Sequence, residues 1–541
     1  MSSIEITVWG NYFVIPVSDY VSQHNLSFWV DGVLADDISV RIDYRNPTAY
    51  SYYPIGSYKG GKITVTASPS LDLQDRQSDT IDHFDGLGCK GSGEVYRPYI
   101  HFTTEYGWIN DPNGLLKYTS PVTGETVYHM FYQHNPYDWV WGNMHWGHAF
   151  SRDLINWEHL PIALYPDEMG TMFSGSAIVD KENRSGLKTG DEDVILLFYT
   201  AAGGCSRLSA GAKSTQCLAY SNDGGMTFTK YEHNPIVPHI IGGNRDPKVI
   251  WCEEIGKYIM ALYLDGRTFA LLASDDFIHW EELQRLDIEN DAECPDIFPL
   301  PVNGDVPDRK WVMIAASSCY VVGEFTDGKF DIIQEPRRLY SGNGSYAAQT
   351  VSTDEEYERI QIAWDNTAVF GNAAFRCQMS VPCTLSLEKD DGGYHLVTKP
   401  IPALDAAARE IQEYCDVEIS SDKRFSAVLD ECAYELDLEL DHDRFVSDIR
   451  MDLLGQVIGI TADGKVNIGN NSVSFTMRED GAKIRIIIDK GTAEVFTDGG
   501  RGVMTTAWLA NLNRMYLEIS LGNPASQPDI IGKITLKKLV P

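Results

Sequence analysis

Three carboxylates stand in short motifs that also contain proline. Asp111 lies in "WINDPNG", Asp246 in "GNRDPKV" and Glu293 in "AECPDIF". Glycoside cleavage uses one ionised carboxylate to attack or stabilise the oxocarbenium-like carbon and one protonated carboxyl group to donate to the leaving oxygen. A third carboxylate can hold sugar hydroxyls, and Arg245 beside Asp246 can keep it ionised. The motifs therefore suggest a glycosidase site, although each one alone is also explained by a turn with a solvated acid.

The stretch 107–114, "GWINDPNG", predicts a chain reversal. Pro112 fixes its own φ and moves Asp111 out of the α region, and Asn113-Gly114 supplies the positive φ that a tight turn needs. We expect this turn to hold Asp111 extended at the lip of a strand.

The middle of the chain repeats itself. The segments 148–160, 218–233 and 271–283 share an apolar strand, a Ser-x-Asp triplet, an aromatic residue and a polar stretch. A strand of the same apolar kind returns at 311–318. One four-stranded unit every 50 to 70 residues or so is typical of a β-propeller, whose blades stack on their neighbours. A large β-sandwich with chance similarity is the alternative.

In a propeller, the innermost strand of each blade begins at the mouth of the central channel, so equivalent places in successive blades should hold unusual polar residues. The three carboxylates occupy such places, together with Ser174 in "MFSGSA" and Gln349 in "YAAQTV". Convergence of three carboxylates on one cavity is unfavourable unless they are used, so a functional site is expected there.

The bulk composition limits the possible partners and compartments. A chain of 541 residues predicts two or three domains. The net charge of -33 without a basic cluster argues against nucleic acid and anionic membranes, and no apolar run approaches the roughly 20 residues of a membrane span. No signal peptide is visible and the ten cysteines form no CxxC pair, so we expect a reduced, cytoplasmic protein. A secreted chain that had lost its signal would look the same, and the oligomeric state stays open.

Helical periodicity is almost absent before residue 400, and short β-rich runs between Gly, Asn, Asp and Pro predict an all-β protein. We predict a small N-terminal β domain over 1–80, a linker over 81–96, a β-propeller over 97–395, a linker with one short helix over 396–414 and a C-terminal β-sandwich over 415–541.

Six motifs, in this order, resemble those of glycoside hydrolase family 32, the β-fructofuranosidases, which include invertases, exo-inulinases and levanases. They are "WINDPNG", "FYQHNP", "WGNMHWGHAFSRDLINWEHLPIAL", "FSGSA", "RDPKV" and "ECPDIF". The resemblance runs from about residue 97 to 400, and "IRIIIDKGTAEVFTDGGRGVMT" resembles the sandwich domain of that family. It implies a five-bladed propeller, whereas the repeats alone indicate three or four blades.

By these motifs, the resemblance implies that Asp111 is the nucleophile, Glu293 the acid/base and Asp246 the transition-state stabiliser. The activity it implies is that of a retaining exo-β-fructosidase on fructans, fructo-oligosaccharides or sucrose, without a cofactor. We expect a raised pKa for Glu293, from the nearby negative charges and apolar walls, with Asp296 as the next candidate for the proton donor. The resemblance also implies a fructose pocket lined by Asn110, Gln133, Trp141, Phe173, Ser174 and Arg245.

Three features depart from the family pattern. Ala292 stands where an aromatic residue commonly precedes Glu-Cys-Pro, which opens the pocket wall or leaves that role to another loop. Gly344-Ser345 replaces an acidic-aromatic pair, which puts contacts beyond the fructose pocket in doubt. The first 80 or so residues lie outside the core pattern, and their role is open.

Two further groups invite other interpretations. His145 and His148 are three apart, which on a strand places them on opposite faces, and no third ligand is in view, so no metal site is expected. Cys294 follows the expected acid and is either a reactive thiol or a packing residue. Packing is favoured because the sequence places no histidine to activate the thiol.

Two alternatives to hydrolysis stay open. A fructosyltransferase on the same scaffold would deliver the fructosyl unit to a sugar instead of water, and nothing in the motifs separates the two activities. A fructan-binding protein with an inactive site is the other alternative. The full set Asp111, Asp246 and Glu293 counts against it, since a binder needs no proton donor.

Overall fold

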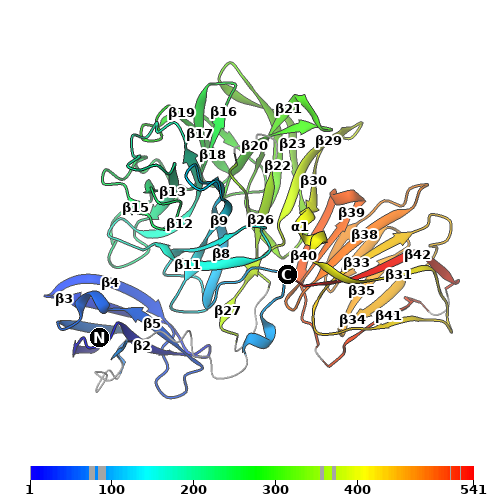
Figure 1. Ribbon diagram of the computed structural model, residues 1–541, viewed down its shortest axis with the longest axis horizontal. Helices are drawn as coiled ribbons and strands as arrows, with labels where there is room; N and C mark the ends of the chain where they lie inside the picture. The colour runs from blue at the N-terminus through cyan, green and yellow to red at the C-terminus, as the bar shows by residue number, and fades with distance from the viewer. Residues whose placement is uncertain are drawn as a thin grey trace.

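The computed structural model describes residues 2–71, 80–82, 93–353, 359–367, 373–511, 513–523 and 526–540. These residues form three β-rich units that follow one another along the chain (Figure 1). The N-terminal unit, in blue, lies below the central propeller, and the C-terminal sandwich, in orange and red, lies beside it.

The N-terminal domain consists of two antiparallel sheets that share one apolar core. Phe28 stacks on Tyr53 across the two sheets, with ring centroids 3.8 Å apart. Because β7 pairs with β2, the domain continues to Ile81, while residues 83–92 of the predicted linker lie outside the described residues. The first sheet has β1 (Ser2–Thr7), β6 (Lys62–Ser68), β3 (His24–Val30) and β4 (Val33–Val40), and the second has β5 (Ala49–Pro54), β2 (Tyr12–Val17) and β7 (Thr80–Ile81).

The central unit is a β-propeller, which confirms the predicted fold, and its described residues form five blades. In four blades the strands pair in chain order, so that each strand neighbours the next along the chain. These strands are β8 (Gly107–Thr119), β9 (Thr126–Asn135), β10 (His145–Ser151), β11 (Trp157–Leu164); β12 (Thr171–Asp180), β13 (Val194–Ala202), β14 (Thr215–Ser221), β15 (Thr229–Lys230); β16 (Arg245–Cys252), β17 (Lys257–Asp265), β18 (Thr268–Ser274), β19 (Glu281–Asp287); and β20 (Asp296–Val302), β21 (Asp305–Ile314), β22 (Cys319–Thr326), β23 (Lys329–Arg338).

The fifth blade is less regular and closes the ring. Its strands are β25 (Ser345–Thr350), β26 (Ile360–Asp365), β28 (Gln378–Met379), β29 (Cys383–Asp390) and β30 (Gly393–Pro400). Between them, β27 (Phe375–Arg376) leaves the blade and pairs in parallel with the start of β8. The last blade is therefore joined to the first by backbone hydrogen bonds, which fixes the strand that carries Asp111.

Burial decreases from the inner strands to the rim of each blade. Every residue of β13 is buried, as expected for a strand covered on both faces by neighbouring blades, whereas β19 is mostly exposed. The Ser-x-Asp repeat predicted from the sequence occupies the same place in three blades. Each Ser-x-Asp triplet begins the turn from the third to the fourth strand, and the serines of the three triplets, Ser151, Ser221 and Ser274, donate hydrogen bonds to their aspartates at 3.1, 2.6 and 3.2 Å.

The prediction of a chain reversal at 107–114 is wrong. These residues lie within β8, which continues from Gly107 to Thr119 and pairs with β9 throughout. The pairing register shifts between Ile109 and Pro112 and again between Asn113 and Leu116. The unpaired residues Asn110-Asp111 and Gly114-Leu115 therefore form two bulges in a continuous strand, on either side of the paired Pro112-Asn113, and the positive φ of Gly114, +49°, is accommodated where the ladder is interrupted.

The C-terminal domain is a β-sandwich, as predicted, with one sheet of seven strands and one of six around a common core. The helix α1 (Pro402–Ala406) lies in the predicted linker, but β30 and β31 extend into that segment from both sides. The first sheet has β24 (Tyr340–Gly342), β40 (Gly502–Ala507), β39 (Thr492–Thr497), β38 (Ala482–Ile488), β33 (Ala433–Leu440), β42 (Asp529–Leu539) and β31 (Ala408–Ile419), and the second has β32 (Phe425–Val428), β41 (Tyr516–Leu521), β34 (Ile449–Leu453), β35 (Gln456–Thr461), β36 (Lys465–Ile468) and β37 (Asn471–Ser474).

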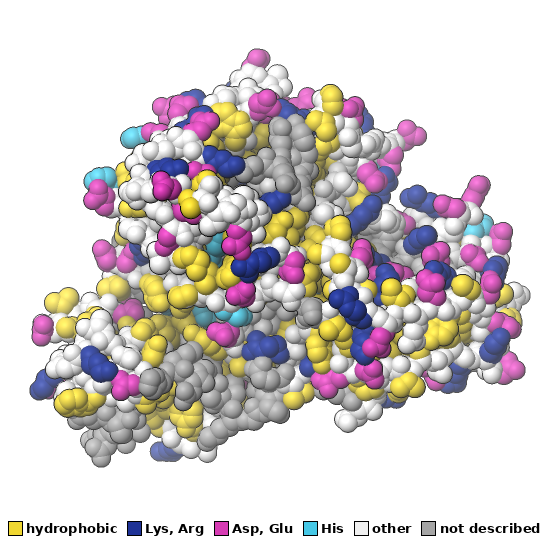
Figure 2. Space-filling model, viewed as in Figure 1, with side chains coloured by type: hydrophobic (Ala, Val, Ile, Leu, Met, Phe, Trp, Pro, Cys, Tyr) yellow, Lys and Arg dark blue, Asp and Glu magenta, His cyan; other side chains and the backbone are white. Residues whose placement is uncertain are grey.

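The surface shows acidic side chains spread over the visible face, with lysines and arginines interspersed among them (Figure 2). Among the described residues, no helix is long and apolar enough to cross a membrane. The nine described cysteines are all unpaired.

Candidate active site

The start of the inner strands encloses a cavity of about 330 Å³ at the propeller mouth. All nine residues that the sequence assigns to the site line this cavity, although they come from segments far apart in the chain. Three additional residues were not predicted. The lining consists of Asn110, Asp111, Gln133, Trp141, Phe173, Ser174, Arg245, Asp246 and Glu293, together with Cys294, Tyr346 and Trp364.

Bulges at equivalent places aim these side chains into the cavity. The register shifts at 109–112 in β8, at 173–175 in β12, at 245–248 in β16 and at 346–349 in β25. A bulge leaves a residue unpaired and re-aims its side chain, and it is common next to active sites. Asp246 and Glu293 also adopt positive φ angles of +65° and +61°, which non-glycine residues rarely adopt.

Asp111 accepts hydrogen bonds on both carboxylate oxygens. The Ser174 hydroxyl donates to Oδ2 at 2.6 Å and the Asn110 amide donates to Oδ1 at 3.1 Å. Asn110 is itself oriented by the Trp108 indole nitrogen, which donates to its oxygen at 2.8 Å. Burial raises the pKa of Asp111 above its ordinary value, and these hydrogen bonds limit the rise because they favour the ionised form.

Asp246 is 3% exposed and shares a neighbour with Asp111. The Cys294 amide donates to Asp246 Oδ2 at 3.0 Å, and the Cys294 sulfur lies 3.5 Å from an oxygen of each aspartate. Burial raises the pKa of Asp246 to about 7; the charge of Arg245 opposes the rise and that of Asp111 adds to it. The two aspartates therefore face the same small volume.

The structure contradicts the expected raised pKa of Glu293. Burial does raise it, but hydrogen bonds from Tyr346 and Arg245, together with the charge of Arg245, bring the pKa of Glu293 below its ordinary value. The Tyr346 hydroxyl donates to Oε2 at 2.6 Å and Arg245 Nη2 donates to Oε1. The expectation failed because it weighed only the neighbouring negative charges and missed two donors that converge on this carboxylate.

Comparison with known proteins agrees with this geometry. Residues 101–400 match the N-terminal domain of glycosyl hydrolases family 32. The chain belongs to glycoside hydrolase family 32. It is 32% identical to a levanase of Bacillus subtilis over 82% of this chain and 71% of the levanase. It is also 36% identical to an invertase of Schizosaccharomyces pombe, over about half of each chain: 53% of this one and 52% of the invertase.

The fold is that of solved structures in this family. The exo-inulinase of Aspergillus awamori superposes with a TM-score of 0.72 over 82% of this chain and 98% of its own, at 22% sequence identity. As a member of family 32, the protein is a glycoside hydrolase that acts on fructosides.

Two departures from the family pattern have structural explanations. Ala292 does not line the cavity, and the aromatic side chains that do so from the fifth blade are Tyr346 and Trp364. Gly344-Ser345 instead contacts the sandwich: the Ser345 hydroxyl donates to the Thr505 hydroxyl at 2.8 Å, and a Cβ on Gly344 would lie 2.7 Å from the Thr505 side chain. These two residues therefore serve packing between domains.

Other candidate groups have partners of their own. His145 and His148 are both buried in β10; a ring nitrogen of His148 lies 3.0 Å from one of His129. Among the described residues, no group of three or more His, Cys, Asp and Glu side chains has a metal-binding arrangement. Asp296 is fully buried, pairs with Lys248 at 3.2 Å and does not line the cavity, so it is no alternative proton donor.

Cys294 is a packing residue that also touches the site. It is 3% exposed, and burial raises the pKa of its thiol well above the ordinary value, with Asp111 and Asp246 adding to the rise. A thiol with such a pKa stays protonated and is a poor nucleophile. Its amide and sulfur instead contact Asp246, and its sulfur also contacts Asp111. Cys294, which follows Glu293 in the chain, therefore joins carboxylates from two other blades.

Tyr346→Phe should move the alkaline limb of the kcat/KM profile to higher pH. The Tyr346 hydroxyl stabilises ionised Glu293, so its removal raises the pKa of Glu293, and activity that needs protonated Glu293 persists to higher pH. The profile is measured on sucrose beside Tyr434→Phe, which removes a hydroxyl in the sandwich. An unchanged limb in Tyr346→Phe would show that this hydrogen bond does not control the acid.

Proposed function

We propose that the protein is a retaining exo-β-fructosidase that releases terminal non-reducing β-D-fructofuranosyl units from fructans, fructo-oligosaccharides or sucrose. The observation that carries this proposal is the meeting of Asp111, Asp246 and Glu293, from three blades, in one cavity. The similarity to a levanase, an invertase and an exo-inulinase supports fructosides as the substrates.

In the first step, Asp111 attacks the anomeric carbon of the terminal fructose. The bond from that carbon to the leaving oxygen breaks, and the leaving oxygen takes the proton of Glu293. A fructosyl ester forms on Asp111. In the second step, ionised Glu293 accepts a proton from water, the water oxygen attacks the same carbon, and free fructose leaves with Asp111 restored.

Arg245 contacts two of the three site carboxylates, Glu293 and Asp246. Its Nη2 donates to Glu293 and its Nε lies 3.7 Å from Asp246, while its guanidinium stacks 4.5 Å above the Tyr263 ring. The charge of Arg245 opposes the rise in the pKa of Asp246 and so favours the ionised form, which binds sugar hydroxyls. Because Glu293 must be protonated to act as the acid, its contact with Arg245 has to weaken before the leaving oxygen is protonated.

The shape of the cavity favours attack on chain ends. Of its lining residues, Asp246 and Cys294 are each 3% exposed, while Trp141 is 53% exposed. A cavity that is closed at one end and open at Trp141 can take up a terminal sugar unit while the rest of the chain stays outside. Pockets of a few hundred Å³ enclose small ligands in this way.

The test is incubation of the protein with inulin, levan and sucrose, followed by separation of the products. We expect free fructose from the earliest times, without intermediate oligosaccharides from the polymers. Longer oligosaccharides formed at high sugar concentration would show that transfer competes with hydrolysis. Binding of these sugars without any release of fructose would contradict the proposal.

A further inference from the structure

The N-terminal domain packs against the propeller near the loop that carries Trp141 (Figure 1). This loop, residues 136–144, connects β9 to β10. The Trp141 ring lies edge-on to Phe173, with centroids 5.7 Å apart, and both side chains line the active-site cavity. Anything that fixes the loop therefore fixes one wall of the site.

The loop inserts two aromatic side chains into the core of the N-terminal domain. Tyr137 and Trp139 are 3% and 4% exposed and pack within the apolar cluster of that domain. The Tyr137 ring lies 5.5 Å from that of Tyr53. On the propeller side, the Trp139 indole nitrogen donates to the Ala374 carbonyl at 2.8 Å. Trp141 is only two residues beyond this anchor.

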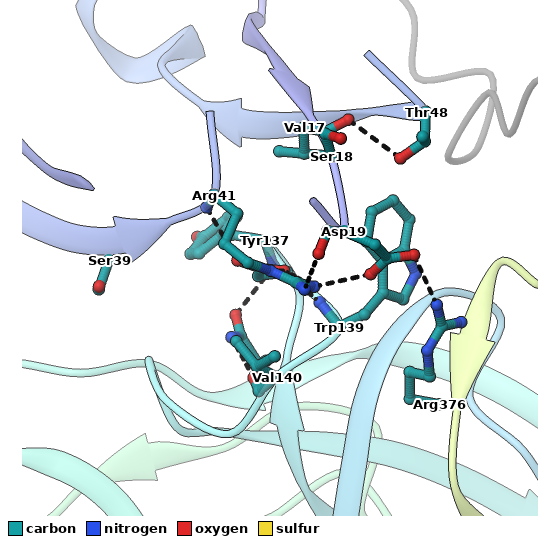
Figure 3. Close-up of polar contacts among 12 residues, drawn as sticks. Val17, Ser18, Asp19, Ser39, Arg41, Thr48, Tyr137, Trp139, Val140 and Arg376 are labelled. Atoms are coloured by element: carbon teal, nitrogen blue, oxygen red, sulfur yellow. Dashed lines mark hydrogen bonds and ion pairs between the residues drawn. The ribbon is translucent and has the colours of Figure 1, made fainter. Parts of the chain in front are cut away.

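A partly buried ion pair fixes the same loop between the two aromatic anchors. Arg41 of the N-terminal domain binds Asp138 through its backbone amide at 2.9 Å, through Nε at 2.9 Å and through Nη2 at 2.6 Å. Figure 3 shows Arg41, the residue after β4, pointing to this loop, with Asp19 bridging to Arg376 of the propeller. Because these three hydrogen bonds need one relative orientation of Arg41 and Asp138, they fix the position of the loop against the N-terminal domain.

The backbone is held on both sides of Trp141. The Asn135 side chain donates to the Val140 carbonyl at 2.8 Å. On the other side, Asn143 exchanges two hydrogen bonds of 2.8 Å with the backbone of Ser39 in the N-terminal domain. Trp141 is therefore exposed to solvent, but the segment that carries it is clamped by a second domain.

We propose that Arg41 is a positioning residue for Trp141, so that the N-terminal domain sets how tightly a fructoside is held at the mouth of the site. This inference rests on the proposed function. Arg41 does not line the cavity. Asp111 and Asp246 lie in inner strands and Glu293 lies just before another, so none of the three carboxylates belongs to the loop. Loosening the loop therefore weakens substrate binding more than it slows the chemical steps.

Arg41→Met keeps the aliphatic stem and removes the guanidinium. We expect KM for sucrose and for a fructo-oligosaccharide to rise between about 10-fold and 100-fold, as when binding contacts are lost equally in ground state and transition state, with kcat changed by much less. The matched control is Lys62→Met, which removes an exposed ion pair with Glu5 in the same domain and should keep the constants of the wild type.

A double-mutant cycle separates positioning from general destabilisation. In a Trp141→Ala background, Arg41→Met should cause no further rise in KM, because Arg41 acts through Trp141. If Arg41→Met does not fold, the same KM comparison is made with Asn143→Gly. This variant removes both hydrogen bonds to Ser39, and glycine readily adopts the φ of +46° found at position 143. The inference fails if KM is unchanged in the folded variant, or if it rises equally with and without Trp141. Absence of fructose release by the wild type would instead contradict the proposed function.

Discussion

Replacement of Asp111 by asparagine should reduce turnover by roughly 10⁴-fold or more, the scale seen when a catalytic nucleophile is removed. Asparagine is nearly isosteric, and its amide can still contact Ser174 and Asn110, so the fold should persist. The loss is chemical, because an amide cannot form the fructosyl ester. Steady-state kinetics on sucrose and thermal unfolding of the same preparation measure both expectations.

The matched control for this variant is Asp327→Asn. Asp327 is exposed in the turn between β22 and β23 with φ of +49°, a conformation that asparagine tolerates, so its activity should equal that of the wild type. Retention of more than about a tenth of the activity in Asp111→Asn would show that another group is the nucleophile.

Glu293→Gln should lower the rate on sucrose by about 10²- to 10⁴-fold, the usual contribution of a general acid. The leaving oxygen of sucrose needs a proton, which glutamine cannot supply. A fructoside with a strongly acidic leaving group departs unaided, so its first step should be affected far less. The limb of the pH profile that Glu293 sets should also disappear, since the glutamine side chain does not titrate.

The comparison of the two substrates distinguishes the acid from a structural role. The glutamine amide in Glu293→Gln can keep the contact with Tyr346, while the charge that pairs with Arg245 is lost. Equal losses on both substrates would exclude Glu293 as the proton donor. Asp296 could not take its place, because it is buried against Lys248 outside the cavity.

The propeller was predictable where its strands carry a repeated turn. The Ser-x-Asp triplets bind their own backbone, so the same local chemistry recurs in three blades. The fourth blade ends in the different turn around Asp327-Gly328, and the fifth is interrupted by β27, which pairs with another blade. Sequence periodicity detects neither, because both depend on contacts with distant segments.

The site residues were predictable because they lie in short motifs, but their electrostatics were not. Tyr346 reaches Glu293 from a separate blade, across 53 positions of sequence. It opens the motif "YAAQTV" that indicated the channel mouth, but the motif does not show which carboxylate the tyrosine contacts. The residues of Asp-Pro-Asn-Gly favour a turn when they are considered alone. Pairing of β8 with β9 and β27 overrides that local preference and keeps the strand continuous through Asp111.

The covalent intermediate tests the central claim most directly. Glu293→Gln is incubated with a fructoside that has a strongly acidic leaving group, so the ester forms readily but is hydrolysed slowly without the general base. The protein is then digested and its peptides are mapped by mass spectrometry. We predict the mass of one fructosyl unit on the peptide that contains Asp111, and no such mass when Asp111→Asn is added. A fructosyl ester on any other residue would contradict the assignment of Asp111 as the nucleophile.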